Sequence, residues 1–149
     1  MERVLRALFL QNAVSAFFLP TAYTDASRLA ILKSNMKKVK ITVLKTTLDA
    51  ELAKEYGVEG LQACPMLKAG QVFYADYAKP EGFCDEAWKA IYQYVFALAH
   101  GAEKGLFYYG DWIRVPGVAI CSCNDGLRPV IFKLEATDET SEINYTPVR

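Results

Sequence analysis

The chain has a single histidine, His100, among its 149 residues. Catalytic and metal-binding schemes that need two imidazoles are therefore excluded, and any ion site has to use thiolates and carboxylates. The chain also lacks a net charge, because 17 Lys and Arg residues balance 17 Asp and Glu residues. Without a net field, the protein surface does not attract nucleic acid or an anionic membrane, so we expect no nucleic-acid partner.

Long apolar runs are also scarce. Gln11 and Asn12 interrupt the apolar part of residues 1–35, whereas a transmembrane helix needs roughly 20 apolar residues. Arg3 and Arg6 precede this stretch and give it a weak likeness to a secretory leader, but no clean small-x-small cleavage site follows. We therefore expect no membrane span and a cytoplasmic location, with export as the alternative.

Familiar catalytic motifs are missing as well. The sequence contains no Walker loop, G-x-G-x-x-G, G-x-S-x-G, H-E-x-x-H or EF-hand pattern, so nucleotide-binding proteins, hydrolases and zincins are not the first choices. The composition does provide 52% apolar residues, which is enough to bury the core of one ordinary domain.

The regular pattern begins at Met36. Residues 1–35 are expected to be an N-terminal extension. Three interpretations of it stay open: a helix around residues 2–18, a leader, or a mis-assigned start of the protein. Residues 36–137 are expected to form the domain, and residues 138–149 a polar tail.

Alternation of apolar and polar residues predicts a strand over 38–46. A short helix is expected over 49–56, with Thr47 as its N-cap and Gly57 as its stop signal. A turn over 68–71 leads to a strand at 72–74. Apolar spacings of three and four predict a long helix from Cys84 or Asp85 to His100, followed by strands within 118–123 and 129–136 joined by a short hairpin loop. The sequence thus predicts an α+β fold, in which a small, mainly antiparallel sheet of about four strands packs against one long helix.

Four cysteines are the most informative residues for function. Cys121 and Cys123 lie two apart on one expected strand and therefore share a face. Cys84 lies at the expected start of the long helix, where the helix dipole favours a thiolate, and Cys64 precedes a proline in a loop. Their spacing matches no standard zinc or ferredoxin motif, and free cysteine is also a common small core residue. A structural disulfide is the least favoured reading in a chain without a convincing leader.

Other side chains have local interpretations. Asp85 is most simply an acid in the first turn of the long helix, and the alternative is that it orients a group bound at Cys84. Arg128 is expected to pair with Asp125 across the hairpin loop. The alternative is that its guanidinium group binds an anionic ligand. His100 is expected to be an exposed residue at the helix end. Three aromatic residues are candidates for a pocket or a homo-oligomer interface: Tyr108, Tyr109 and Trp112.

From Met36 to about Ala136, the chain resembles a family of short, uncharacterised bacterial and archaeal proteins that are common in anaerobes. The resemblance rests on the stretches KKVKITVLKTTL, ACPMLKAGQVF, KPEGFCDEAWKAIYQYVFALAHG and PGVAICSCNDGLRPVIFKLE. Cysteines that match Cys64, Cys84 and Cys123 recur among the members of this family. Cys121, in contrast, matches a position that is usually not the paired cysteine. The family pattern also repeats four residues of the hairpin loop: Asp125, Gly126, Arg128 and Pro129. Family members usually begin near Met36, which implies that the first 35 residues are an accessory segment.

Three hypotheses for the function follow. The first is a metal-binding or cluster-binding module, in which Cys64, Cys84 and Cys123 bind Zn, Cu(I), iron or an Fe–S cluster, with Cys121, Asp85 or an external molecule as fourth ligand. The second is a thiol redox protein or enzyme with Cys84 as nucleophile, Cys64 or Cys123 as resolving partner, and Asp85 and Arg128 as further candidate catalytic residues. The third is a module that binds a small molecule or another protein, in which the cysteines only pack.

Overall fold

The computed structural model describes residues 36–102 and 113–141. These form a four-stranded antiparallel sheet and two helices in the order β1 (Lys37–Thr46), α2 (Ala50–Tyr56), β2 (Val72–Ala75), α3 (Asp85–Ala99), β3 (Val118–Ser122) and β4 (Val130–Thr140). The α+β prediction is confirmed. The expected helix in residues 1–35 and the aromatic residues Tyr108, Tyr109 and Trp112 lie outside the described residues.

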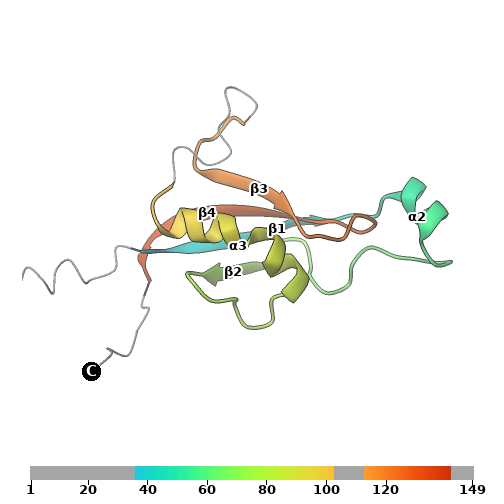
Figure 1. The fold of residues 1–149 in the computed structure, drawn as a ribbon, viewed down its shortest axis with the longest axis horizontal. Helices are drawn as coiled ribbons and strands as arrows, with labels where there is room; N and C mark the ends of the chain where they lie inside the picture. The colour runs from blue at the N-terminus through green and yellow to red at the C-terminus, as the bar shows by residue number, and fades with distance from the viewer. Residues whose placement is uncertain (1–35, 103–112, 142–149) are drawn as a thin grey trace, which may run out of the picture. The chain divides into compact units, whose positions relative to one another are not determined.

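The strands are arranged in the order β2-β1-β4-β3, so the first and last strands of the sequence form the centre of the sheet (Figure 1). Lys37 of β1 pairs with Thr140, and Thr46 pairs with Val130 at the other end of β4. β4 therefore includes the first three residues of the segment expected to be a polar tail. Beyond it, Ser141 donates its backbone N–H to the carbonyl of Met36.

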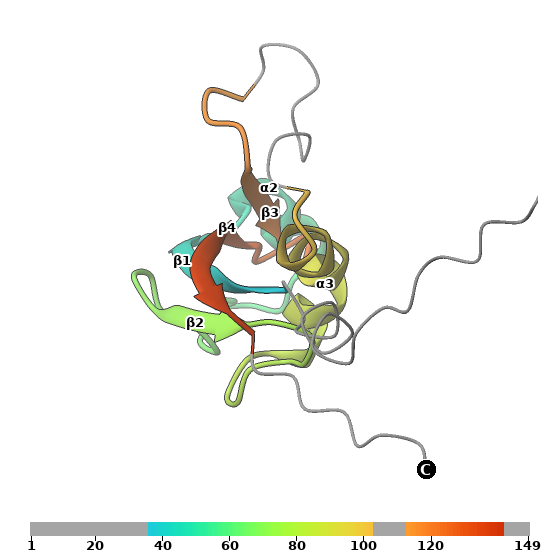
Figure 2. The ribbon, with the colours of Figure 1, turned by 90° about the vertical axis from the view of Figure 1, so that its left-hand side faces the viewer.

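Strict alternation of apolar side chains gives the sheet one buried face. Val39, Ile41 and Val43 of β1 are fully buried, whereas Lys40 and Thr42 between them point to the other side. Helix α3 lies on the buried face (Figure 2). The side chains that β4 and α3 bury in the same core are Val130, Phe132 and Leu134 from the strand and Ala87, Ile91, Val95, Leu98 and Ala99 from the helix.

Both ends of α3 lie where the sequence places them. Cys84 is the N-cap residue, with an extended backbone, and the helix ends at Ala99 with His100 as C-cap. Gly101 follows with φ at +89°, a left-handed conformation that glycine adopts without strain. His100 is exposed, as predicted, and its Nδ1 lies 2.8 Å from the carbonyl oxygen of Phe96.

The cap of α2 differs from the prediction. Asp49, not Thr47, is the N-cap residue, and its carboxylate accepts the backbone N–H of Leu52 at 3.0 Å. The hydroxyl of Thr47 instead donates to the carbonyl of Pro129 at 2.7 Å, which ties the end of β1 to the start of β4. The tertiary partner therefore decides which of two suitable capping residues is used.

Candidate functional site

The four cysteines are all free and half-buried, and each packs against the hydrophobic core. Cys64 lies in the connection between α2 and β2, and Cys84 precedes the first turn of α3 without making a side-chain cap hydrogen bond. Cys121 lies in β3, on the same face as the buried Ala119, and Cys123 directly follows that strand. The predicted common face of Cys121 and Cys123 agrees with this burial pattern.

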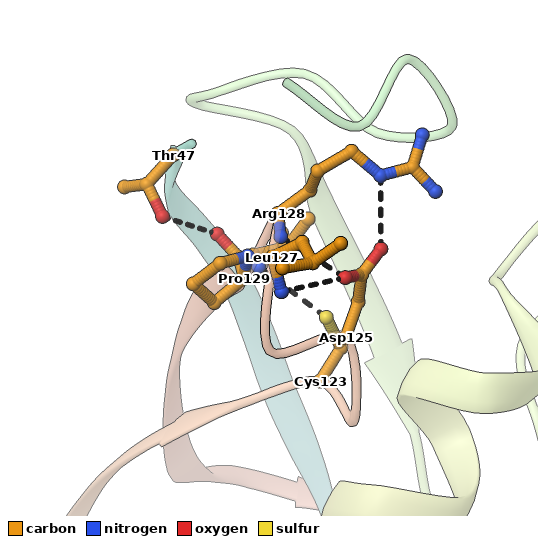
Figure 3. A network of polar contacts seen from close by, with 7 residues as sticks. Thr47, Cys123, Asp125, Leu127, Arg128 and Pro129 are labelled. Atoms are coloured by element: carbon orange, nitrogen blue, oxygen red, sulfur yellow. Dashed lines mark hydrogen bonds and ion pairs between the residues drawn. The ribbon is translucent and has the colours of Figure 1, made fainter. Parts of the chain in front are cut away.

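Cys123 begins the hydrogen-bonded hairpin loop that connects β3 to β4. Its backbone N–H donates to the carbonyl of Val130 at 3.0 Å, and its Sγ accepts the N–H of Val130 at 3.3 Å. The sulfur therefore closes the loop as a hydrogen-bond acceptor and contacts the core at the same time (Figure 3).

Asp125 organises the inside of this loop. Its Oδ1 accepts the backbone N–H groups of Leu127 and Arg128, each at 3.0 Å, and its Oδ2 accepts the Nε of Arg128 at 3.0 Å (Figure 3). This is the local pairing that the sequence predicts. Burial on its own would raise the pKa of the Asp125 carboxyl, but the two N–H groups and the guanidinium outweigh it, so the pKa lies below the ordinary value.

Three further hydrogen bonds hold the loop against the connection between β1 and α2. Pro129 accepts the hydroxyl and the backbone N–H of Thr47, and Leu127 accepts the N–H of Asp49 at 2.9 Å. The backbone of Arg128 is therefore held within the loop, and Nε is the guanidinium nitrogen that is bonded to Asp125. The terminal nitrogens of Arg128 extend away from that carboxylate (Figure 3).

The start of α3 is arranged by ion pairs at the surface. Lys79 lies 2.6 Å from the Asp85 carboxylate and also donates to the carbonyl of Phe83. The Lys79 ammonium group lowers the pKa of Asp85, which is an exposed acid in the first turn of the helix. Glu86 pairs with Lys89, which lies three residues further along the helix. Asp85 therefore has a local lysine partner, in keeping with its simpler interpretation.

The positions of the sulfurs bear on the metal hypothesis. Among residues 36–102 and 113–141, which include all four cysteines, no three Cys, His, Asp or Glu side chains are arranged to hold a metal ion. Burial raises the pKa of the Cys121 thiol to about 12, which makes this sulfur a poor ligand or nucleophile at neutral pH. The metal site at Cys64, Cys84 and Cys123 and the thiol chemistry at Cys84 stay predictions from the sequence.

Sequence reasoning missed an apolar surface on and around α2, here called the α2 surface: Leu48, Leu52, Tyr56 and Val58. None of the seven residues of α2 is buried, and these four side chains are between 37% and 74% exposed. Beside them is an open hollow of about 520 Å³ that Leu48, Val58 and Leu61 help to line. The i,i+4 spacing of Leu48, Leu52 and Tyr56 is visible in the sequence, but it gives no sign that the shared side faces away from the sheet.

A second feature is a groove between α3 and β3. Its volume is about 470 Å³, and its lining includes Ala90 and Tyr94 from the helix and Ile120, Cys121 and Cys123 from or next to the strand. Two of the four cysteines thus face a surface hollow and not a shared ligand position.

The part of the chain that the structure describes contains no helix long and apolar enough to cross a membrane. Comparisons with family profiles, with curated proteins and with solved structures find no match.

Proposed function

We propose that this protein is a non-catalytic interaction module whose α2 surface binds a basic, apolar-faced helix of a partner protein. The observation that carries the proposal is that α2 buries none of its residues, although Leu52 and Tyr56 are large and apolar. A seven-residue helix is marginal by itself in water, so a helix of this length gains most from packing its apolar side against another surface.

The position of α2 supports this role. The helix lies beyond the end of the sheet, away from α3 and the core that α3 covers (Figure 1). Asp49 fixes its first turn, and Gly57 donates its backbone N–H to the carbonyl of Ala53 at the other end. The helix therefore presents Leu52 and Tyr56 outward, and the exposed Leu48 lies directly before its N-cap. Anchors spaced by four residues on a short helix are typical of helix-to-helix docking.

Charge specifies the partner. Four exposed carboxylates flank the α2 surface, against one ammonium group from Lys54; they belong to Asp49, Glu51, Glu55 and Glu59. An apolar stripe bordered by carboxylates complements a helix with an apolar face and flanking Lys or Arg residues. An acidic partner with the same apolar face would be repelled.

The cysteines have a structural role in this proposal. Cys64, Cys84, Cys121 and Cys123 fill space at the margin of the core, and Cys123 also closes the hairpin loop. Small, weakly polar thiols suit half-buried positions of this kind.

The test uses the whole protein and two synthetic helical peptides with the same leucine face, one flanked by lysines and the other by glutamates. Fluorescence anisotropy is expected to show that the lysine peptide binds, that the glutamate peptide does not, and that added salt weakens the binding. Because a buried leucine contributes about 1.5–3 kcal/mol, the Leu52→Gln variant is expected to weaken binding roughly tenfold or more.

Val115→Gln is the matched control, because Val115 is 53% exposed and lies outside the α2 surface. Its affinity for the lysine peptide is expected to equal that of the unchanged protein. Equal affinity of the two peptides, or an unchanged affinity in Leu52→Gln, would contradict the proposal. Circular dichroism checks that both variants keep the fold.

A further inference from the structure

Strand β3 forms one edge of the sheet. It pairs with β4 on one side, from Val118 opposite Glu135 to Ser122 opposite Ile131. In the described part of the chain, no strand lies on its other side. A strand in this position has backbone N–H and C=O groups directed outward, which makes it a template for a further strand.

The common protections of an edge strand are missing from β3. Charged side chains, prolines and bulges usually prevent edge strands from pairing. No charged residue occurs in the nine residues from Pro116 to Asn124, and the only proline lies before the strand. Ile120, in the middle of this stretch, is 45% exposed.

The groove beside β3 offers room for the added strand. It runs between the strand and the flank of α3, where Ala90 and Tyr94 line it, and it also contacts Cys121 and Ile131. None of the residues that line this groove carries a charge. An uncharged strand with small side chains on the side facing α3 would therefore complement it.

We propose that β3 pairs antiparallel with β3 of a second copy of this chain, so that two four-stranded sheets join into one. The chain itself supplies the strand that the groove favours, because β3 is uncharged and carries the small residues Ala119 and Cys121 on its helix side. Self-pairing of an edge strand extends a sheet across a two-fold axis and makes an isologous interface.

The register follows from the uncharged stretch. Its middle residue is Ile120, so a two-fold axis at Ile120 pairs the whole stretch without bringing charges together. Ile120 then lies opposite Ile120 of the second copy, and Ala119 lies opposite Cys121 of the second copy. The exposed isoleucines cover each other on the open face of the sheet, and the small side chains of the added strand pack beside α3.

This surface is separate from the α2 surface, so the two proposals succeed or fail independently. Sedimentation velocity of the full chain over a range of concentrations is expected to show a reversible dimer. Ile120→Lys would place two like charges directly opposite each other and is expected to give a monomer.

Val72→Lys is the matched control. Val72 is 40% exposed on β2, at the opposite edge of the sheet, so this variant is expected to dimerise as the unchanged protein does. A second measurement does not depend on either variant. Amide hydrogen exchange of the unchanged protein is expected to slow over residues 118–122 as the concentration rises, and to stay constant in β2.

Three results would overturn the proposal. One is an unchanged protein that remains monomeric up to about 1 mM. A dissociation constant of about 1 mM corresponds to a free energy of association of only about −4 kcal/mol. Another is an Ile120→Lys variant that still forms the dimer. The third is exchange over residues 118–122 that does not change with concentration.

Discussion

Cys121 shows how strongly its surroundings determine what a cysteine can do. Burial of the side chain raises the pKa of its thiol from 9.0 to about 12. The same residue type at a half-exposed position would react readily above pH 9. The sequence places Cys121 on a strand, but the depth of its sulfur depends on what α3 covers.

The pH dependence of alkylation tests this. Between pH 9 and 11 the rate of alkylation of Cys121 is expected to rise about tenfold per pH unit, because only the thiolate reacts. Peptide-level mass spectrometry after brief treatment with iodoacetamide measures the rate for each cysteine. A plateau for Cys121 near pH 9 would contradict the assigned burial.

The same shift has a consequence for stability. Because the folded pKa is raised, the neutral thiol of Cys121 contributes stability that is fully present below pH 9 and is lost as the pH rises towards 12. The free energy of unfolding is therefore expected to fall less steeply over this range in Cys121→Ala than in the unchanged protein. Chemical denaturation at pH 8 and at pH 10.5 gives the comparison.

Asp125 accepts three hydrogen bonds within the hairpin loop, so its substitution is expected to be costly. Asp125→Ala removes the acceptor of two backbone N–H groups and of the Arg128 guanidinium, so we expect a loss of about 1–3 kcal/mol of unfolding free energy. Asp125→Asn keeps a side-chain oxygen for the N–H groups and is expected to lose less. Urea denaturation at pH 7 measures both, and equal losses would show that the N–H bonds contribute nothing.

At the scale of the elements, an aromatic contact ties α3 to the sheet. Phe83, directly before the helix, is buried, and its ring lies 4.9 Å from that of Phe73 on β2 and 5.5 Å from that of Phe132 on β4. Trp88 of α3 contacts the same ring at 6.2 Å. One side chain therefore joins two strands and the helix.

Phe83→Ala is expected to destabilise the protein by about 3–5 kcal/mol, because it leaves a cavity among three rings. Phe83→Leu fills most of that space and is expected to cost clearly less. Thermal unfolding followed by circular dichroism compares the two variants. If Phe83→Ala unfolds at the same temperature as the unchanged protein, the aromatic contacts of Phe83 are not what holds α3 in place.

The elements differ in how well the sequence predicts them. Helix α3 and strands β1 and β3 follow from periodicity, because each buries one face and the spacing of its apolar residues indicates which face that is. The pattern of α2 looks equally amphipathic, yet its apolar side is exposed. Thr47 looks like a cap but bonds to Pro129, 82 residues away. Local sequence cannot show such partners.

At the scale of the whole molecule, the fold class was predictable, but the positions of the sulfurs were not. Whether Cys64 and Cys84 approach Cys123 depends on strand order and on how α3 crosses the sheet, and both are set by contacts between distant residues. The sequence supplies the candidates for a site, and only the three-dimensional arrangement tests whether they converge.

The chain from Ser34 to Arg149 forms a compact unit of its own, whose described core runs from Met36 to Leu134. We therefore expect the fragment from Met36 to Arg149 to unfold cooperatively with nearly the same midpoint as the full chain. Differential scanning calorimetry of the two proteins provides the test. A fragment without a cooperative transition would show that the first 35 residues are part of the folding unit.

The pairing of β1 with β4 sets the order of events during synthesis. In the middle of the sheet, Thr46 of β1 pairs with Val130 of β4 and Lys37 pairs with Thr140. Nearly the whole domain must therefore be synthesised before β1 can pair with β4. Closing so long a loop before any gain from pairing is slow, and until β4 exists β1 can pair with β2 on one side only. A nascent chain that stalls before Val130 therefore lacks one of the two central strands and the three core side chains that this strand supplies, Val130, Phe132 and Leu134.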